Sequence, residues 1–152
     1  MKHHIYSMIF LLASSIGCQT RIPVFNGNAA FAHLVAQCDF GPRNPGSVGH
    51  QKALDYFLNV LTTVADTVST QSFTEIMPRT KQKVEMHNII AQFNPKAKKQ
   101  IMISAHWDTR PWGDRSLSIM RKDQPILGAN DGASGVAILL ELAKILHENP
   151  QK

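Results

Sequence analysis

Cysteine is scarce in this chain of 152 residues, which contains only Cys18 and Cys38. Two cysteines cannot build a disulfide framework or a zinc site made of thiolates, so both kinds of small cysteine-rich protein are excluded. If Cys18 is modified, Cys38 has no partner within the chain. Cys38 falls on the apolar side of a predicted helix, where we expect a core residue and not a reactive thiol.

The chain also lacks a concentrated basic surface. It has 16 basic and 11 acidic residues, a net charge of +5. The one dense cluster, Lys96, Lys98 and Lys99, follows an Asn-Pro pair that is typical of a turn. A nucleic-acid-binding protein usually shows a basic stripe with interleaved aromatic residues or a recognisable module, and neither is present. We therefore expect no nucleic-acid partner.

An almost uninterrupted apolar run of twelve residues, 5–16, lies at the start of the sequence behind Lys2. A membrane-spanning helix needs about 20 residues, so residues 1–17 are interpreted as an export signal. The run ends in Ser15-Ile16-Gly17-Cys18, which resembles the lipobox of bacterial lipoproteins, although a serine replaces the usual leucine. We expect the protein to be exported to the bacterial cell envelope or periplasm, with a lipid on Cys18 that anchors it to a membrane. The alternatives are an ordinary cleaved signal and an uncleaved anchor.

Residues 18–27 are interpreted as a tether and residues 28–152 as part of one catalytic domain. Two helices are expected first, the second capped by Ser47. His50, in the first turn of that helix and off its apolar stripe, is expected at the surface. The apolar positions of the first helix are Phe31, Leu34, Val35 and Cys38.

Extended segments are predicted over residues 67–76, 84–93 and 100–105, the last being a central, buried strand. A loop of more than twenty residues then leads to a helix over about 133–147, which is apolar almost all round and is therefore expected to be buried. Helices, a strand pair and a strand–loop–helix unit favour a layered α/β domain with a mixed sheet.

Chemistry is concentrated at the end of this predicted strand and in the turn before the last helix. His106 and Asp108 are two residues apart, so they face the same side of an extended chain, where the carboxylate can orient the imidazole. Asp131 sits in the glycine-bounded turn GANDG, and Ser134 is a candidate helix cap. Taken alone, His106 and Asp108 could be a chance pair. Taken alone, Asp131 could belong to a simple loop, with its carboxylate interacting with the dipole of the following helix. Together they indicate the beginning of a zinc site.

Two longer motifs carry a family resemblance: SAHWDTRP at residues 104–111 and PILGANDGASGV at residues 125–136. With GPRNPGS at residues 41–47 and NIIA at residues 88–91, they resemble the zinc-dependent glutaminyl cyclases of bacteria. These enzymes are related to the zinc aminopeptidases of peptidase clan MH. The resemblance extends over roughly residues 28–148 and implies a three-layer α/β sandwich with a mixed β-sheet.

The resemblance also implies roles for individual residues. Asp131 matches the aspartate that binds zinc, bridging two ions in the aminopeptidases and binding one in the cyclases. His106 matches the ligand of the second zinc in the aminopeptidases, a histidine that remains in the single-zinc cyclases without binding zinc. Asp108 matches the carboxylate that orients this histidine. A cis peptide bond is implied between Asp131 and Gly132. Zinc is thus the implied cofactor, with one ion in a cyclase and two in an aminopeptidase.

In the family, a glutamate pair that includes the general base follows the next strand, and another acidic residue and a last histidine come later. Their counterparts would lie beyond Lys152, so no catalytic residue is assigned within the chain. We interpret the chain as an N-terminal portion, truncated after the helix that follows Asp131, and expect it to be inactive alone.

The implied activity is that of a glutaminyl-peptide cyclotransferase, an acyltransferase. It converts the N-terminal glutamine of peptides or proteins to pyroglutamate and releases ammonia. The alternatives are a two-zinc aminopeptidase and a non-catalytic fragment of such an enzyme.

Overall fold

The computed structural model describes residues 22–113, 117 and 119–150. The predicted export signal, Cys18 and the first part of the predicted tether lie outside these residues. The elements, in chain order, are α2 (Gly27–Asp39), α3 (Val48–Val64), β1 (Thr67–Ile76), β2 (Lys83–Gln92), the 3-10 turn η2 (Ile119–Arg121), the π-helical turn η3 (Ala129–Ala133) and α4 (Ser134–Glu148).

The helices begin where polar side chains satisfy their free N–H groups. The Asn26 side chain accepts a hydrogen bond from Ala29 N at the start of α2, and Ser47 Oγ accepts one from His50 N at the start of α3. The predicted cap Ser47 is therefore confirmed. Ser134 is not the cap of α4 but its first helical residue, and its hydroxyl donates to Asn130 O.

The expected apolar stripe of α2 is not the face that the fold buries. Phe31 is 64% exposed and Val35 40%, whereas Ala30 and Gln37 are buried. Gln37 donates to Ala133 O at the start of α4, and the neighbouring helix packs against this side of α2. A small alanine and an amide that bonds the facing backbone let two helices approach closely, and this outweighs the burial of larger apolar side chains.

The predicted strand pair forms a β-hairpin. β1 and β2 pair antiparallel along their whole length, from Thr67 opposite Gln92 to Ile76 opposite Lys83. The connecting turn is closed by hydrogen bonds from Met77 N to Gln82 O and from Lys81 N to Met77 O.

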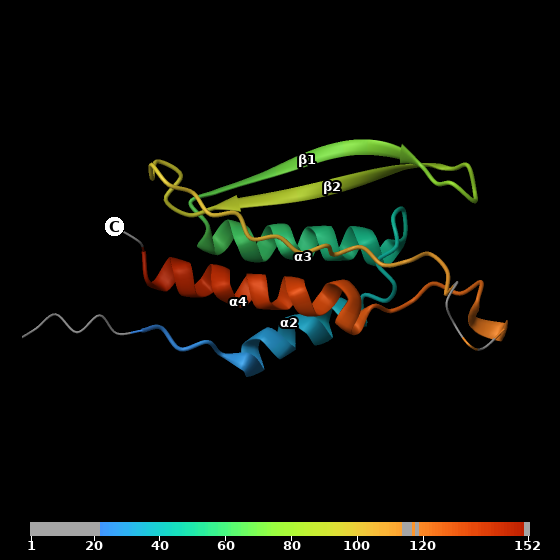
Figure 1. The fold of residues 1–152 in the computed structure, drawn as a ribbon, viewed down its shortest axis with the longest axis horizontal. Helices are drawn as coiled ribbons and strands as arrows, with labels where there is room; N and C mark the ends of the chain where they lie inside the picture. The colour runs from blue at the N-terminus through green and yellow to red at the C-terminus, as the bar shows by residue number, and fades with distance from the viewer. Residues whose placement is uncertain (1–21, 114–116, 118, 151–152) are drawn as a thin grey trace, which may run out of the picture.

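Figure 1 shows the hairpin over α3, with α4 between α3 and α2. Between these elements lies the apolar core, built on Ala53 and Phe57 of α3 and on Val136 and Leu140 of α4. Ile89 of β2, with Ala105 and Trp107 of the following segment, packs against the core from the hairpin side. α4 is buried on this side, but it is not buried all round as its apolar sequence predicted, since Ile138 is 53% exposed.

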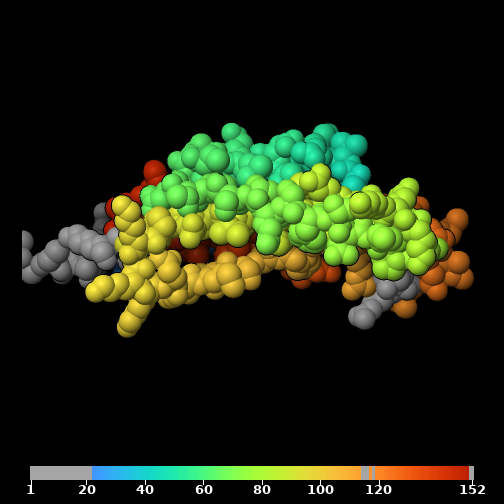
Figure 2. All heavy atoms as spheres, turned by 90° about the horizontal axis from the view of Figure 1, so that it is seen from above, coloured from blue at the N-terminus to red at the C-terminus, as the bar shows by residue number. Residues whose placement is uncertain are grey.

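Residues 100–105 do not form the predicted central strand. The segment is extended but belongs to no ladder, because the sheet of the described residues contains β1 and β2 alone. Ile101 and Met102 are 89% and 91% exposed, and Figure 2 shows the gold segment after β2 at the molecular surface. An apolar run becomes a strand only when another strand satisfies its backbone.

The α/β fold class is confirmed. Over the described residues the sheet is a two-stranded antiparallel hairpin whose helices lie on one side (Figure 1). No described helix combines the length and apolar composition that crossing a membrane would require.

Candidate metal centre

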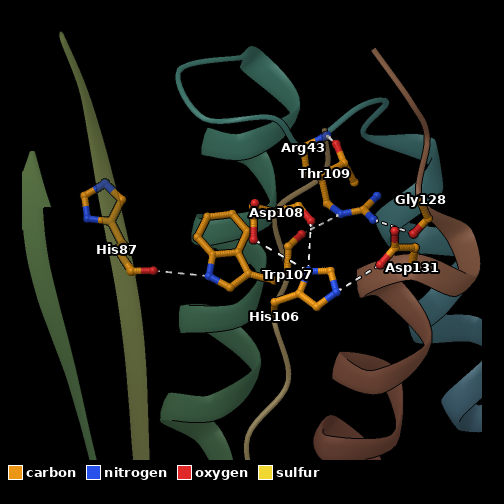
Figure 3. Close-up of polar contacts among 8 residues, drawn as sticks. All are labelled: Arg43, His87, His106, Trp107, Asp108, Thr109, Gly128 and Asp131. Carbon is orange, nitrogen blue, oxygen red and sulfur yellow. Dashed lines mark hydrogen bonds and ion pairs between the residues drawn. The ribbon is translucent and has the colours of Figure 1, made fainter. Parts of the chain in front are cut away.

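The segment after residue 105 is anchored by Trp107. Its ring stacks on the His50 ring, with centroids 4.2 Å apart and an interplanar angle of 24°, and meets the Phe57 ring edge-on. Its Nε1–H donates to His87 O of β2 at 3.2 Å. Since side chains alternate along an extended segment, fixing Trp107 in the core directs its two neighbours, His106 and Asp108, the other way (Figure 3).

His50 is therefore not the surface residue that its helix position predicted. It is buried, with 4% exposure, because Trp107 covers it from a segment more than fifty residues away. Burial lowers the pKa of His50, the nearby His87 lowers it further, and Asp108 opposes the shift.

His106, Asp108 and Asp131 lie together (Figure 3). His106 Nε2 is 3.1 Å from Asp131 Oδ1. On the other side of the ring, Nδ1 is 3.2 Å from the main-chain oxygen of Asp108 and 3.6 Å from its carboxylate. The Nδ1–H can thus donate to Asp108 O, which orients the ring and leaves Nε2 toward Asp131.

Glycine makes room for this contact. Gly128 and Gly132 have positive φ angles of 64° and 105° on either side of Asp131, a conformation that side chains disfavour. A Cβ on Gly132 would come within 3.2 Å of Asp108 O and 3.4 Å of His106 Cε1. The cis bond implied after Asp131 is not observed, since the described residues contain no cis peptide bond.

Arg43 is the residue of this region that the sequence analysis did not single out. It is fully buried, and its guanidinium donates to Trp107 O at 3.1 Å and to Gly128 O at 2.9 Å. Burial lowers its pKa from the ordinary value, with Cys38 and Asp108 opposing the shift. Its place in the GPRNPGS motif was its only signal in the sequence, because a local pattern does not reveal burial.

The donor chemistry fits zinc but is incomplete. An imidazole nitrogen and a carboxylate oxygen are both common zinc ligands, and zinc sites use three or four protein ligands. The described residues contain no group of three or more histidine, cysteine or acidic side chains that could hold a metal ion. Cys38 is a half-buried free thiol, and the predicted lipidation site Cys18 lies outside the described residues.

Residues 88–152 match the model of peptidase family M28. The match begins in β2 and includes His106, Asp108 and Asp131. The chain is also 33% identical over 107 residues to the glutaminyl-peptide cyclotransferase of Drosophila melanogaster, an alignment that covers 70% of this chain and 27% of that protein.

Solved structures of a glutaminyl cyclase and of a Zn-dependent exopeptidase match the fold of this chain. The glutaminyl cyclase of Bacteroides thetaiotaomicron, bound to N-acetylhistamine, has a TM-score of 0.80 and 37% identity, with 85% of this chain and 44% of that chain covered. A Zn-dependent exopeptidase from Parabacteroides distasonis has a TM-score of 0.81 and 34% identity, with the same coverage of both chains.

These likenesses confirm the resemblance to glutaminyl cyclases and to zinc-dependent M28 exopeptidases. They imply zinc as the metal of this family. The chain spans less than half the length of these solved structures and about a quarter of the curated relative.

Proposed function

We propose that this chain provides part of the active site of a zinc-dependent glutaminyl-peptide cyclotransferase, with Asp131 as the zinc ligand and His106 beside it, at the position that would bind the second zinc of an aminopeptidase. The observation that carries the proposal is the 3.1 Å separation of His106 Nε2 and Asp131 Oδ1. Two donor atoms bound to one tetrahedral zinc lie roughly 3.3 Å apart. The two side chains therefore stand at the spacing of a single metal centre, in which Asp131 would hold the ion of a cyclase and His106 would join it in a two-zinc aminopeptidase.

The proposed substrate is a peptide or protein with N-terminal glutamine. Its α-amine attacks the carbonyl carbon of its own side-chain amide, a new C–N bond forms, and the bond to the amide nitrogen breaks. The amine proton passes to the departing nitrogen, which leaves as ammonia. Zinc, when bound, supplies Lewis acid polarisation of the amide oxygen.

The chain's own contribution is to hold and orient. Asp108 O fixes the His106 ring through Nδ1, so the Nε2 lone pair is available on the side of Asp131. Because the reaction is intramolecular, positioning supplies much of its rate. The acidic residues of α4 do not serve as the base. Glu141 is buried and accepts a hydrogen bond from Asn26 N, and Glu148 forms an ion pair with Lys144.

A two-zinc aminopeptidase is a second candidate, favoured by the TM-score of 0.81 to a Zn-dependent exopeptidase. In that case His106 would bind the second ion and Asp131 would bridge both. A non-catalytic fragment is a third candidate, favoured by the lack of a three-ligand group among the described residues.

The test joins this chain to the C-terminal part of the Bacteroides thetaiotaomicron glutaminyl cyclase. We expect the joined protein to release ammonia from a glutaminyl peptide and to hold one zinc per chain. The unextended chain should show no turnover, because loss of a general base alone costs a factor of ~10²–10⁴. Two zinc ions with peptide-bond cleavage would instead identify the aminopeptidase.

Two variants of the joined protein provide the controls. Asp131→Ala should abolish ammonia release. His106→Ala should have a milder effect on a single-zinc cyclase and a severe one on an aminopeptidase. Zinc-dependent turnover by the 152-residue chain alone would show that this chain holds the whole active site and not, as proposed, a part of it.

A further inference from the structure

We infer that Arg43 is the positioning residue that sets the distance between the two halves of the candidate metal centre. One edge of its guanidinium spans both halves: Nε donates to Trp107 O and Nη2 to Gly128 O (Figure 3). The first carbonyl lies between His106 and Asp108. The second lies in the turn that carries Asp131.

A second set of contacts fixes Arg43 to the same segment through its main chain. Arg43 N donates to Thr109 Oγ1 at 2.9 Å, and Thr109 N donates to Arg43 O at 3.3 Å. Nη1 donates to Gln37 O at 3.0 Å, which ties the group to the end of α2. The main chain of Arg43 is thus fixed to the segment that carries His106 and Asp108, and its guanidinium reaches from there to the turn that carries Asp131.

The geometry requires an arginine. A guanidinium is planar and presents its donors as a rigid fork, whereas an ammonium group is a point charge on a flexible stem. Both carbonyls accept from adjacent nitrogens of one plane, so their separation is set by the shape of the group. Arg43 is fully buried and its bonds to the two carbonyl oxygens are part-buried, so losing them would leave both oxygens partly shielded from water and short of a donor.

The turn transmits this constraint to Asp131. Gly128 O also accepts from Ala133 N at 3.2 Å, and this bond closes the turn around Asp131. A shift of Gly128 O would therefore move the Asp131 carboxylate, just as a shift of Trp107 O would move His106. The contact between His106 and Asp131 therefore depends on the positions of both carbonyl groups, Trp107 O and Gly128 O.

The importance of this contact for zinc rests on the proposed function, but the contact itself can be measured without metal. Gly132 lies against the His106 ring, since a Cβ on it would be 3.4 Å from His106 Cε1. The metal-free chain should therefore give a nuclear Overhauser effect between the His106 Cε1 proton and the Gly132 α protons. Zinc affinity is measured in parallel by competition with a chelating dye.

The variants are Arg43→Lys and Arg43→Ala, with Arg79→Lys and Arg79→Ala as matched controls. Arg79 is exposed at the hairpin turn, where it pairs with Asp123 and lies over the Trp112 ring. We expect both Arg43 variants to lose the Overhauser effect and to bind zinc about 10-fold to 100-fold more weakly. Guanidinium at millimolar concentration should restore the effect in Arg43→Ala, whereas methylammonium should not. The Arg79 variants should match the unsubstituted chain.

The results separate this inference from the proposed function. An Overhauser effect that survives in the Arg43 variants, or that is lost equally in the Arg79 variants, would overturn the inference. Global unfolding of both Arg43 variants by circular dichroism would also overturn it, because Arg43 would then support the whole fold and not this contact. If the unsubstituted chain binds no zinc while the Overhauser effects behave as expected, the proposed function fails and the inference holds.

Discussion

At the scale of single residues, burial was decided by partners that are distant in the sequence. His50 lies in the first turn of α3 and off its apolar stripe, yet it is covered by Trp107 and lies near His87. The stack places a titratable ring against the inner side of the segment that carries His106 and Asp108. We therefore expect the stability of this region to depend on pH.

We predict that His50→Phe weakens the pH dependence of stability. The pKa of His50 is lowered by burial, so below about pH 6.5 the unfolded chain binds the proton more readily than the folded chain. The free energy of unfolding therefore falls as the pH drops through this range. Phenylalanine keeps a ring against Trp107 but cannot be protonated, so the loss of stability on acidification should become smaller.

Urea unfolding at about pH 7.5 and about pH 5.5, followed by tryptophan fluorescence, measures this difference. Part of the loss of stability on acidification should persist in His50→Phe, because burial also lowers the pKa of His33. His147→Phe is the control, since His147 is exposed at the end of α4, where its ring contacts Val64 O. An unchanged decline in His50→Phe would contradict the prediction.

At the scale of elements, local pattern sufficed for the hairpin but not for the segment after it. β1 and β2 satisfy each other's backbone over ten pairs, and their predicted bounds were correct to within one residue. Residues 100–105 have a strand-like composition but no ladder partner among the described residues. Exposed, extended apolar backbone of this kind can pair with another chain.

We predict that Ile101→Lys and Met102→Lys reduce self-association of the chain. Both side chains are about nine-tenths exposed, so the substitutions should change the free energy of unfolding by no more than about 0.5 kcal/mol. A charge on an unpaired extended segment opposes edge-to-edge pairing. Sedimentation velocity at several protein concentrations measures the effect.

Ile138→Lys is the matched control for this experiment. Ile138 is also exposed, but it lies in α4, where the helix satisfies the backbone. It should leave the association unchanged. Equal effects of all three substitutions would show that added charge, and not the unpaired segment, governs association.

At the scale of the whole molecule, the candidate metal centre is assembled from three separate stretches of the chain. Arg43 comes from the connection between α2 and α3, His106 and Asp108 from the segment after the hairpin, and Asp131 from the turn before α4. The layers in Figure 1 bring these stretches together, because α4 packs between α2 and α3. The site therefore depends on the packing of the entire described chain.

We propose a further property of the whole molecule: the protein is exported, and Cys18 becomes its lipidated N-terminus. In a bacterial host, mass spectrometry should find a mature chain that begins at Cys18 and carries acyl groups. Cys18→Ser should move the protein from the membrane fraction to the soluble fraction, whereas Cys38→Ser should not. A mature chain that begins at another residue would contradict lipidation.

The sequence by itself determined the local elements and the family resemblance. Ser47 marks a helix start because its side chain can cap a free N–H group, and the composition of residues 67–76 and 84–93 marks the hairpin strands. The spacing of His106 and Asp108 predicted that they face one way, and glycines around Asp131 predicted a tight turn. Each of these features depends on residues that are close along the chain.

Only the tertiary structure decided which residues are buried and which carbonyls need a donor. Gln37 replaced Phe31 at the α2–α4 contact because the helices meet on their small-residue side. His50 became buried under Trp107, and residues 100–105 stayed outside any sheet because a ladder needs a partner. Three main-chain oxygens converge on the guanidinium of Arg43, and two of them, Trp107 O and Gly128 O, come from segments that are distant in the sequence. Convergence of this kind arises only from long-range packing.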